Sequence, residues 1–261
     1  MLGAFIVAIA ATTAAQIAHS LPTAPPLRTP PRGALARPRL NPQAAYVYYN
    51  SAVPDGGFDA MRITMSPRWY REPHAYYYWA YDSNFVSGPR NQWYTGLQPG
   101  SMALFSVFGD GAVPAAKSCF ASADSGPGTS CHISYPWTSG HFYDLTVTLA
   151  RADAGTETWQ GTVTDDNTGE TTLIGRITVP RSWGNIGGSA GINFDEYYQW
   201  QTYGCAVQPQ SQILFLAPVG YANGREYRES LQAGGLAPND SCKPVFYSDG
   251  SSYAYVVTGT P

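Results

Sequence analysis

Apolar and polar side chains alternate with a period of two over most of the chain from residue 44 onward. In 142–151, Tyr143, Leu145, Val147 and Leu149 are separated by single polar residues. Successive side chains of a β-strand point to opposite faces, so this pattern predicts strands with one buried face. Together with short apolar runs it predicts strands at 44–50, 61–66, 75–82, 92–98, 102–108, 142–151, 159–164, 172–179, 189–194, 198–205, 212–216 and 252–258.

The turn sequences between these segments decide the fold class. Residues 165–170, Asp-Asp-Asn-Thr-Gly-Glu, are typical of a hairpin turn. Their oxygen atoms also suit calcium, but the spacing is not that of an EF-hand loop. Only 225–232 has a helical pattern. Many short strands separated by Gly and Pro predict an all-β protein, with one antiparallel β-sandwich or jelly-roll-like domain over 44–261 and a short helix in its C-terminal region.

Composition supports a folded protein with a large core. Of the 261 residues, 44% are hydrophobic and 14% aromatic, and only 13% are charged, whereas soluble domains carry roughly 25% charged residues. The aromatic content argues against disorder. The pI near 5.7 argues against a nucleic-acid partner.

The N-terminal sequence predicts export. Residues 2–18 carry no charge, and the small residues Ala18 and Ser20 follow at positions that suit cleavage. We expect 1–20 to be a signal peptide, a secreted, extracellular protein, and no membrane span after cleavage. No Lys or Arg precedes the apolar run, which leaves a misassigned start or a short anchor as alternatives.

Four cysteines fit an oxidising compartment. They are an even set without a Cys-x-x-Cys pair, which favours disulfides over zinc or free thiols. Four cysteines allow three pairings, and we expect the sequential one, Cys119–Cys131 with Cys205–Cys242.

Residues 21–43 form a separate arm, rich in proline and without acidic or aromatic residues. The arm carries four positive charges, so the net charge of −3 leaves −7 on the remaining residues. Such a segment is expected to be extended. It is either a spacer or pro-segment, or a peptide that docks on a protein partner. The candidate docking residues are Arg28, Arg32, Arg37 and Arg39.

The aromatic run from 76 to 82 is the most suggestive binding feature. Tyr77, Trp79 and Tyr81 can fill the core, while the other face of the strand points outward. Tyrosines beside a carboxylate suit sugars, and they also suit protein interfaces; alternatively, loops bury both faces. The candidate ligand-binding residues are Tyr76, Tyr78, Asp82, Trp93, Gln98, Asp195, Glu196 and Tyr198.

Catalytic and metal motifs are lacking. The sequence contains no Gly-x-Ser-x-Gly, His-Glu-x-x-His, phosphate loop or dinucleotide fingerprint. His74, His132 and His141 have no obvious partner. A glycosidase-type carboxylate pair among Asp82, Asp110, Asp195 and Glu196 requires a geometry that composition cannot show. We therefore expect no catalytic residue, no metal and no cofactor.

Several segments resemble the DUF3472 family. They are Trp93–Gln98, Leu104–Phe108, Gly126–Cys131 and Tyr135–Tyr143, within about residues 45–200. The family usually has Gly where this chain has Trp93. The resemblance implies an all-β fold and a carbohydrate context, and it supplies no catalytic residues.

These observations predict a secreted, non-catalytic binding module, lectin-like, whose ligand is carbohydrate. One alternative is an adaptor or structural subunit of a secreted multiprotein complex, which docks a secreted protein partner through the arm. A glycan-active enzyme is a further alternative.

Overall fold

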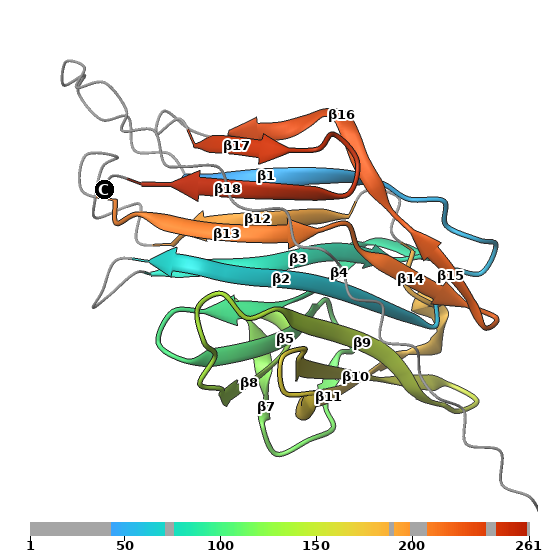
Figure 1. The fold of residues 1–261 in the computed structure, drawn as a ribbon. Coiled ribbons are helices and arrows are strands. Elements are labelled where there is room, and N and C mark those ends of the chain that lie inside the picture. The colour runs from blue at the N-terminus through green and yellow to red at the C-terminus, as the bar shows by residue number, and fades with distance from the viewer. Residues whose placement is uncertain (1–42, 71–75, 188–190, 199–207, 239–243, 260–261) are drawn as a thin grey trace, which may run out of the picture. The chain divides into compact units, whose positions relative to one another are not determined.

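The chain forms two antiparallel β-sheets. The computed structural model describes residues 43–70, 76–187, 191–198, 208–238 and 244–259 (Figure 1). These ranges contain eighteen strands and one short 3₁₀ helix, η1 (Arg181–Trp183), and no α-helix. No helix within them has the length and apolar character that crossing a membrane requires.

The first sheet has eight strands. Its spatial order is β16 (Ser230–Pro238), β1 (Gln43–Asn50), β12 (Ile192–Tyr197), β3 (Tyr77–Phe85), β4 (Gly88–Gln98), β5 (Met102–Phe108), β8 (Gly126–Ser134) and β7 (Cys119–Ala123). Strand β12, far along the chain, lies between β1 and β3, so the centre of this sheet joins distant parts of the sequence.

The second sheet has ten strands. Its main path is β17 (Val245–Ser248), β18 (Tyr253–Thr258), β13 (Ser211–Leu216), β2 (Ala60–Tyr70), β9 (Tyr143–Ala152), β10 (Thr156–Asp165), β11 (Glu170–Pro180) and β6 (Val113–Pro114). The hairpin of β14 (Val219–Ala222) and β15 (Arg225–Arg228) pairs with β2 beside this path.

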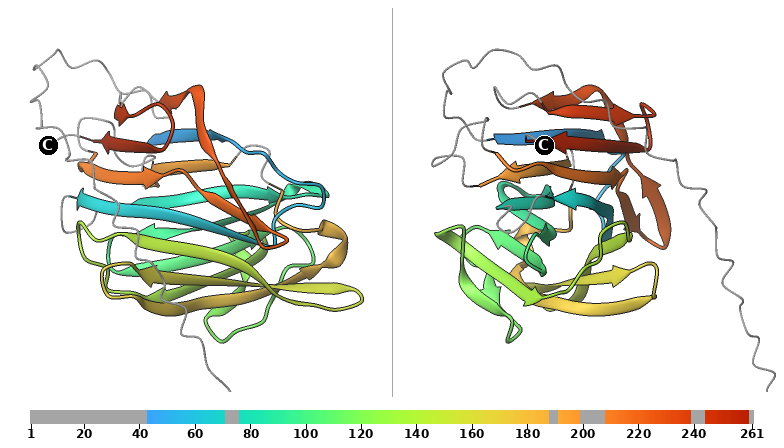
Figure 2. Two further views of the ribbon diagram at one scale, coloured as in Figure 1. Left: turned by 45° about the vertical axis from the view of Figure 1, so that its right-hand side comes forward. Right: turned by 60° about the vertical axis from the view of Figure 1, so that its left-hand side comes forward.

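The two sheets pack face to face as a sandwich. In Figure 1, β18 lies in front of β1, β13 in front of β12 and β2 in front of β3. Figure 2 shows the same two layers from other directions. The expected all-β sandwich is confirmed.

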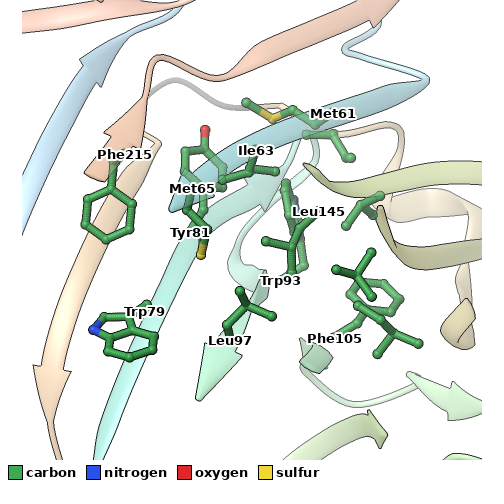
Figure 3. Packing of buried hydrophobic residues seen from close by; sticks show 14 of the residues in the cluster. Met61, Ile63, Met65, Trp79, Tyr81, Trp93, Leu97, Phe105, Leu145 and Phe215 are labelled. Atoms are coloured by element: carbon green, nitrogen blue, oxygen red, sulfur yellow. The ribbon is translucent and has the colours of Figure 1, made fainter. Parts of the chain in front are cut away.

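Large apolar side chains from both sheets fill the space between them. Trp79, Tyr81 and Trp93 of the eight-stranded sheet are fully buried, as are Met61 and Met65 of the ten-stranded sheet (Figure 3). Removing a buried aromatic side chain costs about 3–5 kcal/mol of stability. The core therefore holds the eight-stranded sheet firmly, which is the sheet that carries the candidate site.

The strands predicted at 142–151, 159–164 and 172–179 are confirmed as the meander β9–β10–β11, with Asp165 opposite Glu170 across the predicted turn. The predicted helix at 225–232 is wrong. Asn223 and Gly224 have φ of 51° and 72°, which is typical of a tight hairpin turn. This turn pairs Arg225 with Ala222, and the following residues continue as strands.

A disulfide joins Cys119 to Cys131, which face each other in the β7–β8 pair. This half of the predicted pairing is confirmed, and it fits an extracellular protein. The other half, Cys205–Cys242, lies outside the described residues. So do the predicted signal peptide, His74 and the candidate docking residues Arg28, Arg32, Arg37 and Arg39. Of the strand predicted at 198–205, only Tyr198 is described, and it is in a turn.

Candidate active site

Three polar side chains form a row on the outer face of the eight-stranded sheet, the face turned away from the second sheet. Glu196 of β12 lies directly opposite Tyr78 of β3. Trp79 lies opposite Leu97, so one further step in this antiparallel register places Tyr78 beside Gln98. We call Gln98, Tyr78 and Glu196 the polar row.

Strand alternation explains why these three side chains point outward. Each residue of the row has a fully buried neighbour on its own strand: Leu97 precedes Gln98, Trp79 follows Tyr78, and Asp195 precedes Glu196. Successive side chains of a strand face opposite sides. The polar row therefore belongs to the outer face, where Gln98 keeps 7% of its surface exposed and the other two more.

The spacing of the row leaves room for one small group above it. Neighbouring strands lie about 4.8 Å apart, so the backbones of Gln98 and Glu196 are about 10 Å apart. Tyr78 stands between them, and its ring packs on Tyr198, with centroids 4.8 Å apart. A side-chain hydrogen bond joins Gln98 to Tyr78. The amide and the carboxyl can thus converge on one water molecule or carbonyl group.

Burial controls the protonation of the row. Partial burial raises the pKa of Glu196, and the nearby carboxylate of Asp124 raises it further. Burial also raises the pKa of Tyr78, as does Asp124, while the hydrogen bond from Gln98 opposes the shift. Glu196 forms none of the ion pairs found in the described part of the chain. It can therefore hold a proton at a higher pH than an ordinary glutamate.

Small residues lie at the centre of the outer face, one step inward from the row. Ala80 of β3 pairs with Gly96 of β4. A Cβ atom at Gly96 would lie 2.5 Å from that of Ala80 and would also collide with the carbonyl oxygen of Trp79. No larger side chain fits at Gly96, and Ala80 beside it is fully buried in a cluster with Tyr94 and Leu104.

Two pockets lie on the outer face, and each includes one residue of β3 in its wall. The larger pocket, about 340 Å³, lies over β4, β5, β7 and β8 and includes Tyr78 and Gln98 in its wall. The smaller pocket, about 170 Å³, lies over β1 and β12 and includes Glu196. The polar row thus borders both pockets, one at each end.

Asp82 lies in the smaller pocket, and burial raises its pKa to about 7. Asp82 is four residues from Tyr78 on β3, a separation of about 13 Å along the strand. Because Tyr78 lies directly opposite Glu196, the backbones of Asp82 and Glu196 are at least that far apart. A glycosidase pair needs its carboxyl groups about 5–10 Å apart. Asp82 and Glu196 do not have the strand positions of such a pair, although both line the same pocket.

Most of the predicted binding residues lie on the outer face, but two do not. Tyr76, Tyr78 and Tyr198 form an aromatic cluster next to Glu196. Trp93 and Asp195 were wrongly assigned to a ligand surface. Both are fully buried between the sheets, because each precedes an outward-facing residue by one position.

The interior positions have their own partners. Trp93 packs on Tyr81, with ring centroids 5.6 Å apart. Asp195 accepts a hydrogen bond from Thr258, at 3.0 Å, and burial raises its pKa to about 7. Both residues therefore belong to the interior between the two sheets and not to the outer face.

The remaining titratable candidates are dispersed. His141 pairs with Asp165, Nδ1 to Oδ2 at 3.0 Å, on the ten-stranded sheet. Asp110 is exposed and lines neither pocket. His132 lines the larger pocket. No group of three or more His, Cys, Asp or Glu side chains in the described ranges is arranged to hold a metal ion.

Sequence reasoning missed several residues of the larger pocket, chiefly Tyr94, Phe120 and Asp124. Phe120 and Asp124 lie between the two disulfide-bonded cysteines. The sequence Ala-Asp-Ser-Gly at 123–126 is typical of a hairpin turn. That signal predicts a hairpin, but it does not tell which face of the sheet the turn overhangs.

No protein-family model and no curated protein sequence matches the chain, so the resemblance to DUF3472 stays a prediction. Among solved structures, the chain is similar to scytalido-glutamic peptidase with a transition state analog inhibitor: 10% identity, TM-score 0.45, covering 84% of this chain and 98% of that one. A second structure, scytalido-glutamic peptidase with a peptide-based transition state analog, has 12% identity and a TM-score of 0.45, covering 84% of this chain and 98% of that one. SCP-B of the eqolisin family, in complex with the tripeptide Ala-Ile-His, has 10% identity and a TM-score of 0.41, covering 83% of this chain and 96% of that one.

These structures correct the predicted function. The proteins with a similar chain trace are peptidases, whereas the sequence analysis predicted a non-catalytic carbohydrate-binding module, with an adaptor or a glycan-active enzyme as alternatives. The prediction of a carbohydrate ligand depended on an outward-facing aromatic strand, which does not by itself identify a sugar-binding surface.

Proposed function

We propose that the outer face of the eight-stranded sheet is the active site of a hydrolase that cleaves peptide bonds. The observation that supports this proposal is the polar row, in which an amide and a carboxyl side chain flank Tyr78 across three neighbouring strands. The proposal depends on these residues of the chain and not on the likeness to solved peptidases.

Glu196 is the proposed general base and acid. Its carboxylate accepts a proton from a water molecule while the water oxygen bonds to the carbonyl carbon of the substrate. The C–N bond then breaks, and the same proton passes from Glu196 to the leaving nitrogen. A raised pKa suits both steps, because the group must hold the proton between them.

Gln98 is the proposed electrophilic partner. Its side-chain N–H groups can donate a hydrogen bond to the carbonyl oxygen, where negative charge develops in the transition state. Tyr78 is a positioning residue, since its hydrogen bond to Gln98 limits the orientations of the amide. With 7% of its surface exposed, Gln98 is also shielded from competing water.

The two pockets support an extended polymeric substrate. The polar row borders the larger pocket at Gln98 and the smaller pocket at Glu196. A bond cleaved above the row would therefore have a side chain on either side of it in a separate pocket. An extended peptide that crosses the strands above the polar row satisfies this arrangement.

The test uses matched amide and carboxyl variants. Unfolded protein substrates are incubated with the protein in a series of buffers of increasing pH, and mass spectrometry identifies new peptide termini. Gln98→Ala should lower kcat by about 10²–10³, and Glu196→Gln by about 10²–10⁴. Gln92→Ala, an exposed glutamine on the same strand, and Glu226→Gln, an exposed glutamate of β15, should retain full activity.

Two outcomes would reject the proposal. One is an absence of cleavage by the wild type across a broad set of peptides. The other is cleavage that survives in Glu196→Gln. We also propose that the protein is exported: the Cys119–Cys131 disulfide supports this, and mass spectrometry of the protein from its native supernatant would test it.

A further inference from the structure

The larger pocket is lined by aromatic, apolar and hydroxyl-bearing side chains, with a single carboxylate at its rim. Tyr94, Leu104 and Phe120 contribute the walls, and Ser106 and Ser130 are joined by a hydrogen bond of 2.9 Å. Phe120 is 45% exposed, so its ring is accessible from the solvent side of the pocket. Pockets that bind ligands commonly combine apolar walls with a few placed polar groups.

The carboxylate belongs to Asp124, at the tip of the β7–β8 hairpin. Asp124 and Ser125 have φ of 43° and 65°, and Ala123 pairs with Gly126 around them. The hydroxyl of Tyr94 donates a long hydrogen bond, 3.4 Å, to Oδ1 of Asp124. The tight turn and this contact place the carboxylate over the pocket.

The disulfide restrains the hairpin that carries Asp124. Cys119 and Cys131 face each other across β7 and β8, and Cys131 is fully buried. The wall of the pocket therefore depends on a covalently closed hairpin. A pocket restrained in this way can discriminate between side chains with little loss of conformational entropy on binding.

Asp124 forms no ion pair with any described residue. The titratable groups around it are Tyr78, Tyr94, Glu196 and His132. Two of them are neutral tyrosines, one is another carboxyl, and His132 packs edge-on against Phe120, with ring centroids 5.3 Å apart. No Lys or Arg lines the pocket, so its negative charge is not balanced within it.

We propose that the larger pocket is a specificity subsite that binds the side chain of a lysine or arginine of the substrate, with Asp124 as its counter-ion. This inference rests on the proposed peptidase function and adds the substrate class. The long apolar stem of a basic side chain can contact Leu104 and the rings of Tyr94 and Phe120, while its charged end reaches the rim.

Paired peptides test the subsite. Two peptides differ only by lysine or norleucine at one position, and the position is moved through the residues on both sides of the cleaved bond. At the position that enters the pocket, the wild type should show a kcat/KM roughly tenfold higher for lysine, the size expected from one charged contact. Asp124→Asn should reduce this ratio to near one, and asparagine tolerates the left-handed turn.

A matched control removes the same charge elsewhere. Asp55→Asn lies in the exposed loop between β1 and β2 and lines neither pocket, so it should leave the lysine-to-norleucine ratio unchanged. Because burial raises the pKa of Asp124, the lysine preference should also increase as the pH rises and the carboxyl ionises.

The outcomes separate this inference from the proposed function. Cleavage of both peptides at equal rates, or a lysine preference that survives Asp124→Asn, would overturn the subsite while leaving the peptidase intact. If no peptide is cleaved, the peptidase fails, and the subsite is decided by calorimetric titration of the same peptides. Tighter binding of lysine peptides that is lost in Asp124→Asn supports it, and equal binding overturns it.

Discussion

The hydroxyl of Tyr81 lies 3.3 Å from Oε2 of Glu229 in the interior of the sandwich. Glu229 is only 3% exposed, and burial raises its pKa to about 7. Asp82 and Asp195 are also raised to about 7 by burial. Folding therefore places three carboxyl groups where the neutral, protonated form is preferred.

The first prediction concerns stability against pH. A carboxyl with a pKa raised by folding stabilises the protein below its unfolded pKa, near 4, and this contribution is lost as the pH rises toward 7. For Glu229 alone the loss is about 3 kcal/mol. Denaturant unfolding at pH 4, 6 and 8 should show the free energy of unfolding falling in that order.

Glu229→Gln should reduce this pH dependence, because the uncharged amide has no proton to lose, while Asp82 and Asp195 retain their contributions. The exposed Glu226→Gln variant should retain the wild-type profile. A free energy of unfolding that is constant from pH 4 to 8 in the wild type would contradict the burial of ionisable groups.

The second prediction concerns the pH profile of activity. If Glu196 is the base, kcat/KM should rise with pH as Glu196 ionises, with an acid limb above the ordinary range for glutamate. The carboxylate of Asp124 contributes to that raised pKa, so Asp124→Asn should move the acid limb to lower pH. A limb that stays in place would show that Asp124 does not act on the titrating group.

The third prediction concerns Gly96. A methyl group there collides with Ala80 and with the backbone of β3, so Gly96→Ala should lower the free energy of unfolding by about 1–3 kcal/mol. Gly155→Ala, in the β9–β10 turn, meets no atom within 4 Å and should be nearly neutral. Thermal unfolding of both variants measures the difference.

The fourth prediction separates a core residue from a site residue. Trp93→Ala should cost about 3–5 kcal/mol of stability, because the side chain is fully buried. Tyr78→Phe keeps the ring and removes only the hydroxyl that is hydrogen-bonded to Gln98. It should lower kcat with little change in stability or KM; a change in KM alone would assign Tyr78 to substrate binding instead.

Local alternation was enough to predict most strands and both faces of β3. Tyr77, Trp79 and Tyr81 are buried, and Tyr78 and Asp82 are on the other face, as the pattern indicated. Alternation within one strand does not reveal which face meets a second sheet when both faces carry apolar or aromatic residues. Trp93 and Asp195 were misplaced for that reason.

The grouping of the site could not be derived from the sequence. Gln98, Tyr78 and Glu196 were each candidates, but β12 pairs with β3 across a long stretch of intervening chain. Such pairing is set by the whole sheet, not by local residues. A local turn signal was more informative there: the Asn223–Gly224 pair favours a hairpin turn just before 225–232, the segment that was predicted to be a helix.

The register of β12 carries a consequence for how this protein can change during evolution. A shift of that strand by one residue would turn the carboxyl of Asp195 toward the outer face and bury that of Glu196 between the sheets. Every other side chain of β12 would change faces as well. Insertions or deletions that shift β12 by an odd number of residues should therefore remove Glu196 from the polar row, whereas a shift by two residues keeps the same set of side chains on the outer face.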